Sequence, residues 1–412
     1  VVGVCKVVNE NKKNAWLVLG GNGPTPIAEY CIEQTNADVT VLGEGEETIV
    51  ELLECKLNSP ESISEVQGIV YWVGKQVVQN QRRKPPKLDT LPLPAWDLFP
   101  MDKYTTCLKV PRMKEADIVF PMITTRGCIS KCSFCYRMES GIRIRKPEHI
   151  IEEMKDLHKK YGVTYFIFFD ELSVISKKQI LKFSSMIKEN FEDIRFYMNC
   201  RVDVFDDEIA CAMKEAGCAL INIGFESTDQ NRLDLLGKRV TVEQNINAAE
   251  LALKYDMAIG LNLIWGLPGD NERTLRENTE FIKRYNRYDQ IRTMRPVSPY
   301  PGSPLYYLAI QKGLLKGPAD FFAKFKNADL YMVNFMGIPE KDIYEMLFDV
   351  NKDLILDHYR HTSNDMEEAD RLIQQFYNLY FKGNVSLAGP RHDDKLPFNS
   401  KRDKKMQGTL HG

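Results

Sequence analysis

The sequence predicts an α/β protein built around a partial (β/α)6 barrel, preceded by part of a doubly wound α/β domain and followed by a helical extension. From residue 118 to about 310, near-continuous apolar strands alternate with helices, as in a parallel sheet with helices outside. Upstream of it, strands, glycine turns and helices alternate in a doubly wound pattern. We therefore divide the chain into a partial α/β domain (1–60), a connector (61–117), the partial barrel (118–310), a helical C-terminal domain (311–389) and a disordered tail (390–412).

Composition sets bounds on the kind of protein this is. The chain has 412 residues, is 43% hydrophobic and 27% charged, and carries a formal net charge of −2. Such a balance is typical of a globular protein and argues against a general nucleic-acid binder. No apolar run is long enough to span a membrane. The 10 irregularly spaced cysteines argue against a disulfide framework and favour a reducing compartment, so we expect a cytoplasmic protein.

The N-terminal stretch holds two apolar strands, each followed by a glycine turn and a helix. The turn residues are Gly20 and Gly21 after the first strand, and Gly43, Glu44 and Gly45 after the second. Glycines let a backbone turn sharply or approach a ligand closely, and acidic residues also favour a helix N-terminus. The residues alone thus leave tight turns and ligand contact as equal interpretations. The chain begins at Val1 without signal-peptide order, and we expect that it starts within a longer protein.

The predicted barrel elements follow in chain order. The expected strands are 118–125, 165–169, 196–200, 219–224, 259–265 and about 291–296. Between them, helices are expected at about 147–161, 176–190, 206–216, from 241 onward, and at about 274–285. Pro147 suits a first helical turn, Gly162 a helix end, and Thr241 with Gln244 forms a capping box. A connector hairpin around Gly74 and proline-stiffened segments precede them.

Three cysteines follow the first barrel strand at C-x3-C-x2-C spacing, namely Cys128, Cys132 and Cys135. With 10 cysteines in 412 residues, fewer than roughly one such chain in a hundred would show this spacing by chance. Thiolates are the usual ligands of iron–sulfur clusters, most of which take four, so three would leave one iron open. Unrelated thiols and a three-thiolate zinc site with a distant histidine are the alternatives; zinc sites usually use C-x2-C.

Polar residues gather just after the predicted strands. They are Asp170 and Glu171 after the second strand, Arg201 after the third, Glu226 after the fourth, Lys238 a dozen residues later, Gly266 after the fifth and Tyr300 after the sixth. In parallel barrels, sites lie at the carboxyl ends of the strands, so we expect these residues and the cysteine loop to meet at one mouth. Solvated strand ends and surface ion pairs are the alternative for the charged residues, and packing is the alternative for Tyr300.

The cysteine loop resembles the cluster loop of the radical S-adenosylmethionine (radical SAM) superfamily. The resemblance implies a 4Fe–4S cluster on Cys128, Cys132 and Cys135, with the open iron chelating the amino and carboxylate groups of S-adenosylmethionine. Phe134 matches the aromatic position that packs near the adenine, and Gly266 lies in a Gly-Leu-Pro-Gly turn similar to the family's fifth-strand signature.

The resemblance also assigns the charged strand ends. Asp170 and Glu171 occupy the position that contacts the amino group of S-adenosylmethionine, where the family has Gly-Gly-Glu, so which carboxylate acts stays open. Glu226 matches a position that bonds the ribose or methionyl group. Lys238 matches a basic residue that reaches the substrate carboxylate, and Arg201 lies at the corresponding end of the third strand.

The N-terminal turns resemble the second half of the cobalamin-binding domain that precedes many radical SAM cores. This implies a cobalamin site that includes Gly20, Gly21, Gly43, Glu44 and Gly45, with the first pair beside the nucleotide tail. The family's Asp-x-His-x-x-Gly motif, whose histidine can ligate cobalt, belongs to the first half and does not occur in this sequence.

The resemblance, which covers about residues 15–310, implies reductive cleavage of S-adenosylmethionine to a 5′-deoxyadenosyl radical. Within this superfamily, the chain resembles the cobalamin-type subgroup, which includes radical methyltransferases and anaerobic tetrapyrrole cyclases. We therefore expect cobalamin-dependent methyl transfer to an unactivated carbon of a small molecule, with flavodoxin or ferredoxin as the reductant. Radical cyclisation or rearrangement without methyl transfer is one alternative. A non-catalytic cluster-bearing sensor or electron-transfer protein is another, although polar strand ends favour an enzyme. No basic RNA-binding module is evident.

Overall fold

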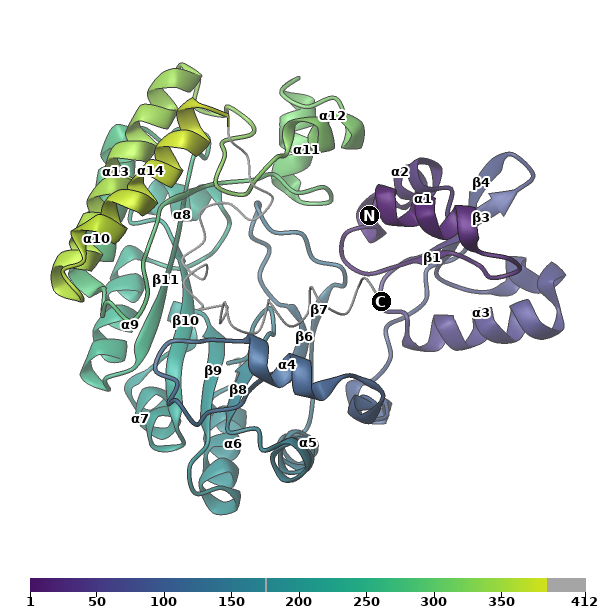
Figure 1. Ribbon diagram of the computed structural model, residues 1–412, viewed down its shortest axis with the longest axis horizontal. Helices are drawn as coiled ribbons and strands as arrows, with labels where there is room; N and C mark the ends of the chain where they lie inside the picture. Colours follow the sequence, from purple (N-terminus) through teal and green to yellow (C-terminus); the bar gives the residue numbers. More distant parts are fainter. Residues whose placement is uncertain (175, 384–412) are drawn as a thin grey trace, which may run out of the picture.

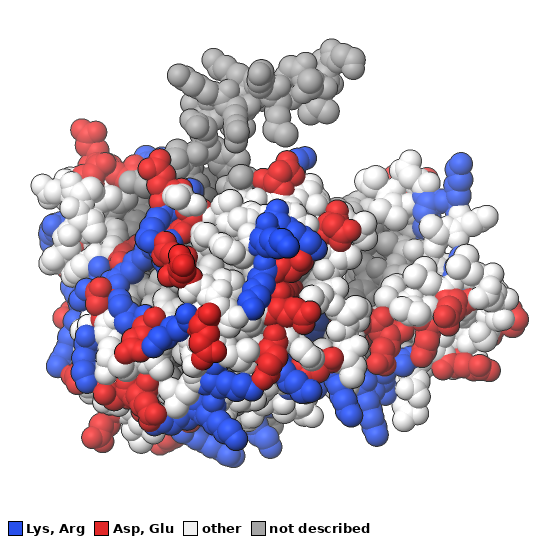
Figure 2. All heavy atoms as spheres, turned by 90° about the horizontal axis from the view of Figure 1, so that it is seen from below, with Lys and Arg blue, Asp and Glu red and all other residues white. Residues whose placement is uncertain are grey.

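The computed structural model describes residues 1–174 and 176–383, so the tail expected at 390–412 lies outside the described residues. Figure 1 shows a small N-terminal unit beside a large open barrel, with a hairpin between them. That hairpin is formed by β6 (Thr125–Cys128) and β7 (Gly141–Ile144), which pair antiparallel. Figure 2 shows basic and acidic side chains intermixed over the face seen from below, in keeping with the near-neutral net charge.

The N-terminal unit is built on a sheet of order β1-β2-β3-β4. Its strands are β1 (Val18–Leu19), β2 (Val39–Val41), β3 (Ile69–Val73) and β4 (Gln76–Gln79). The parallel β1–β2 pair agrees with the doubly wound pattern. The hairpin β3–β4, which we expected within the connector, adds antiparallel to β2 because Ile69 and Tyr71 share an apolar core with Val39, Val41 and Leu52.

Helices cover this sheet and lead along the connector. They are α1 (Val2–Asn11), α2 (Ala28–Thr35), α3 (Glu46–Asn58) and α4 (Met101–Cys107), with 3-10 turns η1 (Thr25–Ile27), η2 (Pro60–Glu65), η3 (Leu88–Thr90) and η4 (Trp96–Leu98). Helix α3 begins directly after Gly45, and its first turn carries Glu46 and Glu47, which favourably meet the positive helix N-terminus. Helix α1 was not expected from the sequence.

The barrel sheet has the strand order β12-β11-β10-β9-β8-β5, and every pairing in it is parallel. Its strands are β5 (Val119–Met122), β8 (Tyr165–Phe168), β9 (Arg195–Cys200), β10 (Cys218–Glu226), β11 (Ala258–Trp265) and β12 (Arg295–Pro296). The predicted partial barrel of six parallel strands is therefore confirmed. Because neighbouring strands run in one direction, their carboxyl ends share one edge, beside the β6–β7 hairpin.

Helices pack on the outer face of the barrel sheet. They are α5 (Pro147–Tyr161), α6 (Lys177–Asn190), α7 (Asp207–Glu215), α8 (Gln230–Leu235), α9 (Val242–Lys254) and α10 (Glu272–Tyr285). As predicted, α5 begins at Pro147 and ends at Gly162 in the left-handed region, and Thr241 and Gln244 form a reciprocal capping box. Side chains such as Phe196, Met198 and those of alternate positions on β8, β10 and β11 bury against these helices in the main core.

The C-terminal extension is helical. It contains α11 (Pro304–Gln311), α12 (Pro318–Lys324), α13 (Glu340–His361) and α14 (Met366–Phe381). In Figure 1, α13 lies beside α10 on the outside of the barrel and α14 packs against α13, whereas α11 and α12 lie nearer the N-terminal unit. Buried Asn351 of α13 accepts from the Met294 N–H at 2.7 Å and donates to the Met294 carbonyl at 3.2 Å, and so joins the extension to the segment just before β12. Within the described residues, no helix is both long and apolar enough to cross a membrane.

Candidate active site

The three cysteines lie at one end of the β6–β7 hairpin. Cys128 is the last residue of β6, and Cys132 and Cys135 follow in the connecting loop. The strands come close at Gly127, where φ is 87° and an added Cβ atom would lie 2.5 Å from the Gly141 carbonyl oxygen. Only glycine is tolerated there, directly before the first cysteine.

Backbone hydrogen bonds anchor the cysteine loop to the barrel. The Ser133 N–H donates to the Leu236 carbonyl at 2.8 Å, and the Ser133 carbonyl accepts from the Leu305 N–H at 2.7 Å. Phe134 packs beside Leu236, Leu267 and Leu305 in an apolar cluster. The loop is therefore fixed between the end of α8, the turn after β11 and the start of α11, and Phe134 lies next to the turn that contains Gly266.

The three thiols influence one another. Burial raises the pKa of the Cys132 thiol, while the positive charges of Lys238 and Arg201 partly offset this. Cys135 keeps accessible surface, yet the surrounding protein removes enough water to raise its pKa to about 11, and the Cys132 and Cys128 sulfurs add to the effect. Sulfurs that repel one another as thiolates, beside cationic groups, suit a shared metal cluster, whose iron replaces the protons.

Arg201 links the cysteine loop to the barrel mouth. Its side chain is 11% exposed and pairs with Asp203, with the Nε–Oδ1 and Nη2–Oδ2 distances both 2.9 Å. It also donates to the Ser130 hydroxyl, and to the Lys238 carbonyl at 3.0 Å. The guanidinium thus lies between the loop and the segment after α8, as its predicted position at the end of β9 requires.

Glu226 and Lys238 form a buried ion pair at the mouth. The Nζ–Oε1 distance is 2.7 Å, and the two residues are 8% and 5% exposed. Glu226 adopts the left-handed region, with φ of 65°, at an irregularity in the β10–β11 register. The neighbouring Gly224 leaves room for the pair, because a Cβ atom there would lie 2.4 Å from Glu226 Oε1 and 2.9 Å from Lys238 Nζ. Strained backbone residues cluster at active sites and ligand-binding segments, so Glu226 is a candidate functional residue.

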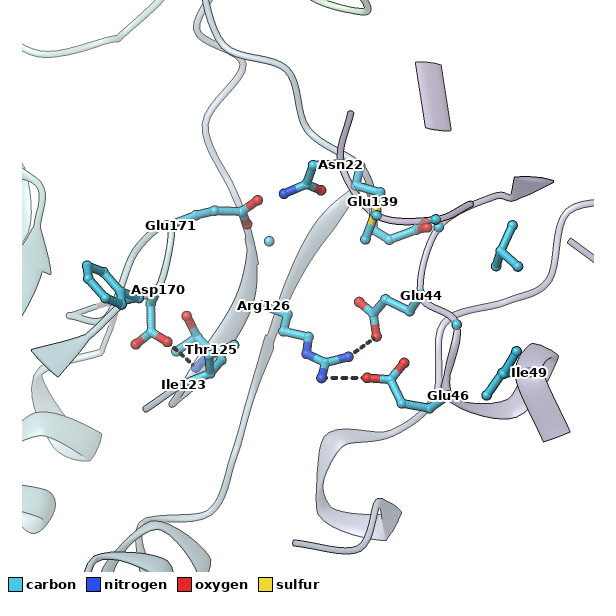
Figure 3. A pocket seen from close by; sticks show the side chains of 18 of the residues that line it. Asn22, Glu44, Glu46, Ile49, Ile123, Thr125, Arg126, Glu139, Asp170 and Glu171 are labelled. Carbon is cyan, nitrogen blue, oxygen red and sulfur yellow. Dashed lines mark hydrogen bonds and ion pairs between the residues drawn. The ribbon is translucent and has the colours of Figure 1, made fainter. Parts of the chain in front are cut away.

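Asp170 and Glu171 have different surroundings. Asp170 is 3% exposed, and its carboxylate accepts from the Thr124 and Thr125 backbone N–H groups at 2.7 and 3.0 Å and from the Thr124 hydroxyl. Burial nevertheless raises its pKa. Glu171 is exposed, and Figure 3 shows it extending into a cavity toward Asn22. Asp170 holds the segment that leads into β6, whereas the Glu171 carboxylate accepts from the Gly127 N–H and otherwise faces the cavity.

That cavity lies between the N-terminal unit and the barrel mouth. Its volume is about 680 Å³. The predicted cobalamin and S-adenosylmethionine residues that line it are Gly20, Gly21, Gly43, Glu44, Gly45, Asp170 and Glu171. Residues 20–21 and 43–45 thus face the strand ends across one space, although the two groups are more than a hundred positions apart in the chain. None of the lining residues is a histidine.

Glu44 does not project freely into this cavity. Its carboxylate accepts from Arg126 of β6 at 2.7 Å and from both terminal nitrogens of Arg143 of β7. Arg126 also reaches Glu46, with an Nη2–Oε1 distance of 2.6 Å (Figure 3). Burial opposes ionisation of Glu44, but the hydrogen bonds from Arg143 and Arg126 outweigh it and lower the pKa of the carboxyl. These pairs clamp the N-terminal unit onto the hairpin that ends in Cys128.

Gly266 lies in a tightly held turn after β11. The Asp270 carboxylate accepts from the Gly266 and Leu267 N–H groups, both at 2.9 Å. The Tyr331 hydroxyl donates to the Gly266 carbonyl at 3.0 Å, and an added Cβ atom at Gly266 would lie 2.4 Å from the Tyr331 ring. Gly266 has a φ of 102°, so both its conformation and its contact require glycine.

Tyr300 is 46% exposed and lies in an aromatic cluster. Its ring centroid is 6.0 Å from that of Phe321 and 5.9 Å from that of Phe325, both of which follow α11 in the chain. The ring therefore packs in this cluster while part of it stays accessible. The adjacent Gly302 lies against Tyr136 of the cysteine loop and Pro26 of the N-terminal unit.

Sequence reasoning missed several residues that shape the site. Arg126 and Arg143 were not singled out, although Arg126 stands two residues before Cys128. Tyr331 lies in the C-terminal extension, far from any motif, and only its contact with Gly266 reveals it. An arginine adjacent to a motif offers a sequence signal, whereas a tyrosine 65 residues away from its partner offers none.

Comparisons with known proteins identify the class. The family profile of the Radical SAM superfamily matches residues 122–282. An uncharacterized methyltransferase of Pyrococcus horikoshii is 31% identical over 323 residues, covering 76% of this chain and 67% of the relative. With its three-cysteine loop at the mouth of a partial barrel, the chain belongs to the radical SAM superfamily, a superfamily of enzymes that use a 4Fe–4S cluster and S-adenosylmethionine.

More distant relatives extend this picture. The anaerobic magnesium-protoporphyrin IX monomethyl ester cyclase of Cereibacter sphaeroides is 28% identical over 311 residues, covering 73% of this chain and 49% of the cyclase. The chain thus spans about half the length of that relative. Among solved structures, the cobalamin-dependent S-adenosylmethionine radical enzyme OxsB with aqua-cobalamin bound has a TM-score of 0.65 at 18% identity, covering 98% of this chain and 64% of OxsB.

A second solved structure has the same fold over a smaller part of the chain. The radical S-adenosylmethionine methyltransferase TsrM from Kitasatospora setae, with cobalamin and a 4Fe–4S cluster bound, has a TM-score of 0.60 at 17% identity. The match covers 75% of this chain and 60% of TsrM. At these identities the likeness shows the fold alone.

Proposed function

We propose that the chain is a radical SAM enzyme that transfers a methyl group to a carbon of a small molecule, with a cluster on Cys128, Cys132 and Cys135. The observation that carries this proposal is the convergence of the cysteine loop, the Glu226–Lys238 pair and Glu171 at one mouth. When bound, the cluster supplies the electron that cleaves S-adenosylmethionine. The chain's own residues hold the reactants in place and exclude water.

The charged residues of the mouth suit the methionyl part of S-adenosylmethionine. Glu171 is the accessible carboxylate beside the cysteine loop, so we assign it the ammonium group. Asp170 serves instead as the support that fixes Thr124 and Thr125. The Glu226–Lys238 pair offers an acceptor and a donor to the ribose and carboxylate, and Arg201 keeps the cysteine loop in register with them.

The adenine is assigned to the region beside Phe134 and the Gly266 turn. Phe134 packs beside Leu267, and the Gly266 backbone is fixed by Asp270 on one side and Tyr331 on the other. A backbone held this rigidly presents its peptide groups without a change in conformation when a base stacks against it. Tyr331 is thus a positioning residue that acts through Gly266.

Cobalamin is assigned to the cavity of about 680 Å³. Its glycine edges at Gly20, Gly21, Gly43 and Gly45 allow a large flat cofactor to approach the backbone, and its far wall is formed by the barrel strand ends. Glu44 supports the wall through Arg126 and Arg143 rather than contacting the cofactor. Because no histidine lines the cavity, cobalt would be held without a histidine ligand from these residues.

Radical cyclisation without methyl transfer is the second candidate, and the 28% identity to the anaerobic cyclase over 73% of this chain favours it. A small-molecule substrate and a flavodoxin or ferredoxin reductant are part of both proposals. The two differ in whether a methyl group leaves S-adenosylmethionine, which a product assay separates.

The test is product analysis by mass spectrometry on anaerobically reconstituted and reduced protein, with S-adenosylmethionine, with and without methylcobalamin. Formation of S-adenosylhomocysteine that depends on cobalamin supports methyl transfer. 5′-Deoxyadenosine alone favours the cyclisation candidate, and neither product argues for a non-catalytic cluster protein.

Cysteine variants give this assay its control. Cys128→Ala, Cys132→Ala and Cys135→Ala are each expected to lose the brown chromophore and all product. Cys211→Ala on the outer helix α7 is the matched control and should retain both. Unchanged iron content in the three loop variants would show that Cys128, Cys132 and Cys135 do not bind the cluster.

A further inference from the structure

A row of asparagine side chains crosses the inner face of the barrel. Asn199 of β9, Asn222 of β10 and Asn262 of β11 occupy positions that alternate with core residues such as Met198 and Ile223. Alternate residues of a strand face opposite sides, so the three amides share the concave side, away from the outer helices. Asn199 and Asn222 are half-buried and Asn262 is exposed, which leaves the row accessible from inside the barrel.

Hydrogen bonds connect the row in one direction. Asn262 Nδ2 donates to Asn222 Oδ1 at 2.8 Å, and Asn222 Nδ2 donates to Asn199 Oδ1 at 2.8 Å. Asn199 Nδ2 donates to the Asp170 carbonyl, and Asn262 Nδ2 also donates to the Ile223 carbonyl at 3.1 Å. Backbone carbonyls accept only, so both ends independently fix which amide atom is nitrogen.

Glycines make the row possible. Asn222 pairs with Gly260 in the sheet register, and a Cβ atom at Gly260 would lie 1.9 Å from Asn222 Oδ1. A side chain at Gly260 would therefore displace the Asn222 amide and break the link to Asn262. Asn262 in turn pairs with Gly224, the residue that leaves room for Glu226 and Lys238. The same glycine-bearing strands thus support the amide row and the charged pair above it.

The row lies one layer below the candidate active site. Asn262 pairs with Gly224, and the Glu226 and Lys238 side chains fold over that glycine, since a Cβ atom there would lie 2.4 Å from Glu226 Oε1 and 2.9 Å from Lys238 Nζ. At the other end, Asn199 bonds the carbonyl of Asp170, the residue that holds the entry to the cysteine loop. Beneath the row, Tyr165, Ile167 and Ala219 close the barrel with an apolar cluster. A molecule inside the barrel and below the mouth would therefore rest on the three amides.

The amides retain hydrogen-bonding capacity toward the barrel interior. Each amide nitrogen has two hydrogens, and Asn222 and Asn199 each use one of them within the row. Asn262 Oδ1 accepts no hydrogen bond from the residues that the structure describes. The row thus offers neutral donors and, at its exposed end, a neutral acceptor.

We propose that Asn199, Asn222 and Asn262 form the floor of the substrate site, and that the substrate presents a neutral carboxamide or lactam group to them. This inference rests on the proposed function, since it names the substrate class for the same mouth. A carboxamide carries a donor and an acceptor side by side, which matches the capacity of the row. A hydrocarbon face would leave the amides desolvated and unpaired, and the three neutral amides themselves supply no charge to pair with an isolated carboxylate or ammonium.

Three small probes on one ring test the chemistry. Nicotinamide, nicotinate and 3-methylpyridine are offered to the reconstituted protein by equilibrium dialysis, with S-adenosylmethionine present to fill the neighbouring site. We expect nicotinamide to be retained and the other two to be retained weakly. Asn222→Leu and Asn262→Leu should each weaken nicotinamide binding about tenfold, the worth of one hydrogen bond to a neutral group.

Controls separate binding from folding. Asn190→Leu, at the end of outer helix α6, should bind nicotinamide like the unaltered protein. Asn262 is exposed, so Asn262→Leu should keep the thermal transition of the unaltered protein even where Asn222→Leu lowers it. Asn222→Asp keeps the side-chain shape but cannot donate to Asn199, and should lose nicotinamide without gaining nicotinate.

Equal retention of all three probes, or unchanged nicotinamide binding in both leucine variants, overturns the inference. 5′-Deoxyadenosine is measured on the same preparations. If it forms while nicotinamide does not bind, the inference fails and the proposed function stands. If nicotinamide binds but no S-adenosylmethionine is cleaved, the proposed function fails and the row is not a substrate floor.

Discussion

Glu44, at the junction between the N-terminal unit and the barrel, and Glu226, at the barrel mouth, are both buried carboxylates paired with basic residues. Glu44 is held by Arg126 and Arg143, whose side chains are 28% and 24% exposed. Glu226 pairs with Lys238, whose side chain is 5% exposed. Sequence motifs suggested a ligand role for both. The difference is that Glu44 and its two arginines join two parts of the chain. The Glu226–Lys238 pair lies within one part, near Cys132, and its glutamate has a left-handed backbone.

The difference between Glu44 and Glu226 predicts that substitutions in the Glu226–Lys238 pair cause the largest loss of stability. Glu226→Gln or Lys238→Met should each destabilise the barrel by about 3–5 kcal/mol, because each leaves one buried charge without its partner. The double variant should recover a large part of that loss. Urea unfolding of the three variants measures this. Glu277→Gln, in an exposed pair with Arg273, is the control and should change the stability by less than about 0.5 kcal/mol. Single variants that behave like this control would contradict the account.

The two adjacent carboxylates after β8 differ in the same way: Asp170 supports the fold, whereas Glu171 is proposed to bind S-adenosylmethionine. Glu171→Gln should raise the KM for S-adenosylmethionine about tenfold or more, since a charge-assisted hydrogen bond is lost, with little change in stability. Asp170→Asn should instead lower the thermal transition. The amide keeps one oxygen for the Thr124 and Thr125 N–H groups, but it loses the negative charge and places a donor where the second oxygen accepts from the Thr124 hydroxyl. Steady-state kinetics and thermal unfolding of both variants give the answer. An equal effect of both on KM would show that the division of roles is wrong.

The sequence predicted the barrel because its signals are local. Apolar strands, the Pro147 and Gly162 helix boundaries and the Thr241–Gln244 capping box depend on residues close in the chain. Contacts such as Tyr331 on Gly266 or Arg143 on Glu44 depend on how distant segments meet, and no local pattern encodes them. The hairpin β6–β7 was missed for a related reason, since Gly141–Ile144 is a short segment whose partner is set by the cysteine loop.

The site shows the same division. Spacing alone identified Cys128, Cys132 and Cys135. Chain position placed Glu226 and Arg201 at strand ends, where the structure has them, and Lys238 follows α8 and pairs with Glu226. Sequence could not separate Asp170 from Glu171, because the separation depends on which carboxylate turns toward Thr124. It also gave no sign of the asparagine row, whose members are 23 and 40 positions apart and meet only through strand register.

At the junction, Glu44→Gln should weaken the clamp by about 2 kcal/mol, the loss of charge-assisted hydrogen bonds to two arginines. The cost is smaller than at Glu226 because Arg126 keeps Glu46 and both arginines reach solvent. The expected result is faster proteolysis in the connector, with an unchanged urea midpoint for the barrel. Glu33→Gln on α2 serves as the matched control. An unchanged rate of proteolysis in Glu44→Gln would show that Glu44 does not hold the N-terminal unit to the hairpin.

The lowered pKa of Glu44 gives the clamp a pH dependence. A carboxyl whose folded pKa lies below its unfolded value of about 4.3 stabilises the folded state fully above that value. This contribution is lost as the pH falls through the folded pKa. Connector proteolysis of the unaltered protein by an acid-tolerant protease should therefore accelerate as the pH falls below about 4. Glu44→Gln should show a flatter profile, and identical profiles would speak against Glu44 as the titrating group.

The smallest effect is expected where the N-terminal unit touches the C-terminal extension. The rings of Tyr30 on α2 and Phe322 on α12 stack with centroids 6.0 Å apart and planes 7° apart. Both rings keep accessible surface, so Tyr30→Ala or Phe322→Ala should cost about 0.5–1.5 kcal/mol of docking energy, less than the charged clamp. Hydrogen exchange of α2 measures it, with Tyr377→Ala on α14 as the control. Protection of α2 that falls more in Phe322→Ala than in Glu44→Gln would reverse the order, and would make the aromatic stack, not the arginine clamp, the main connection between the two parts.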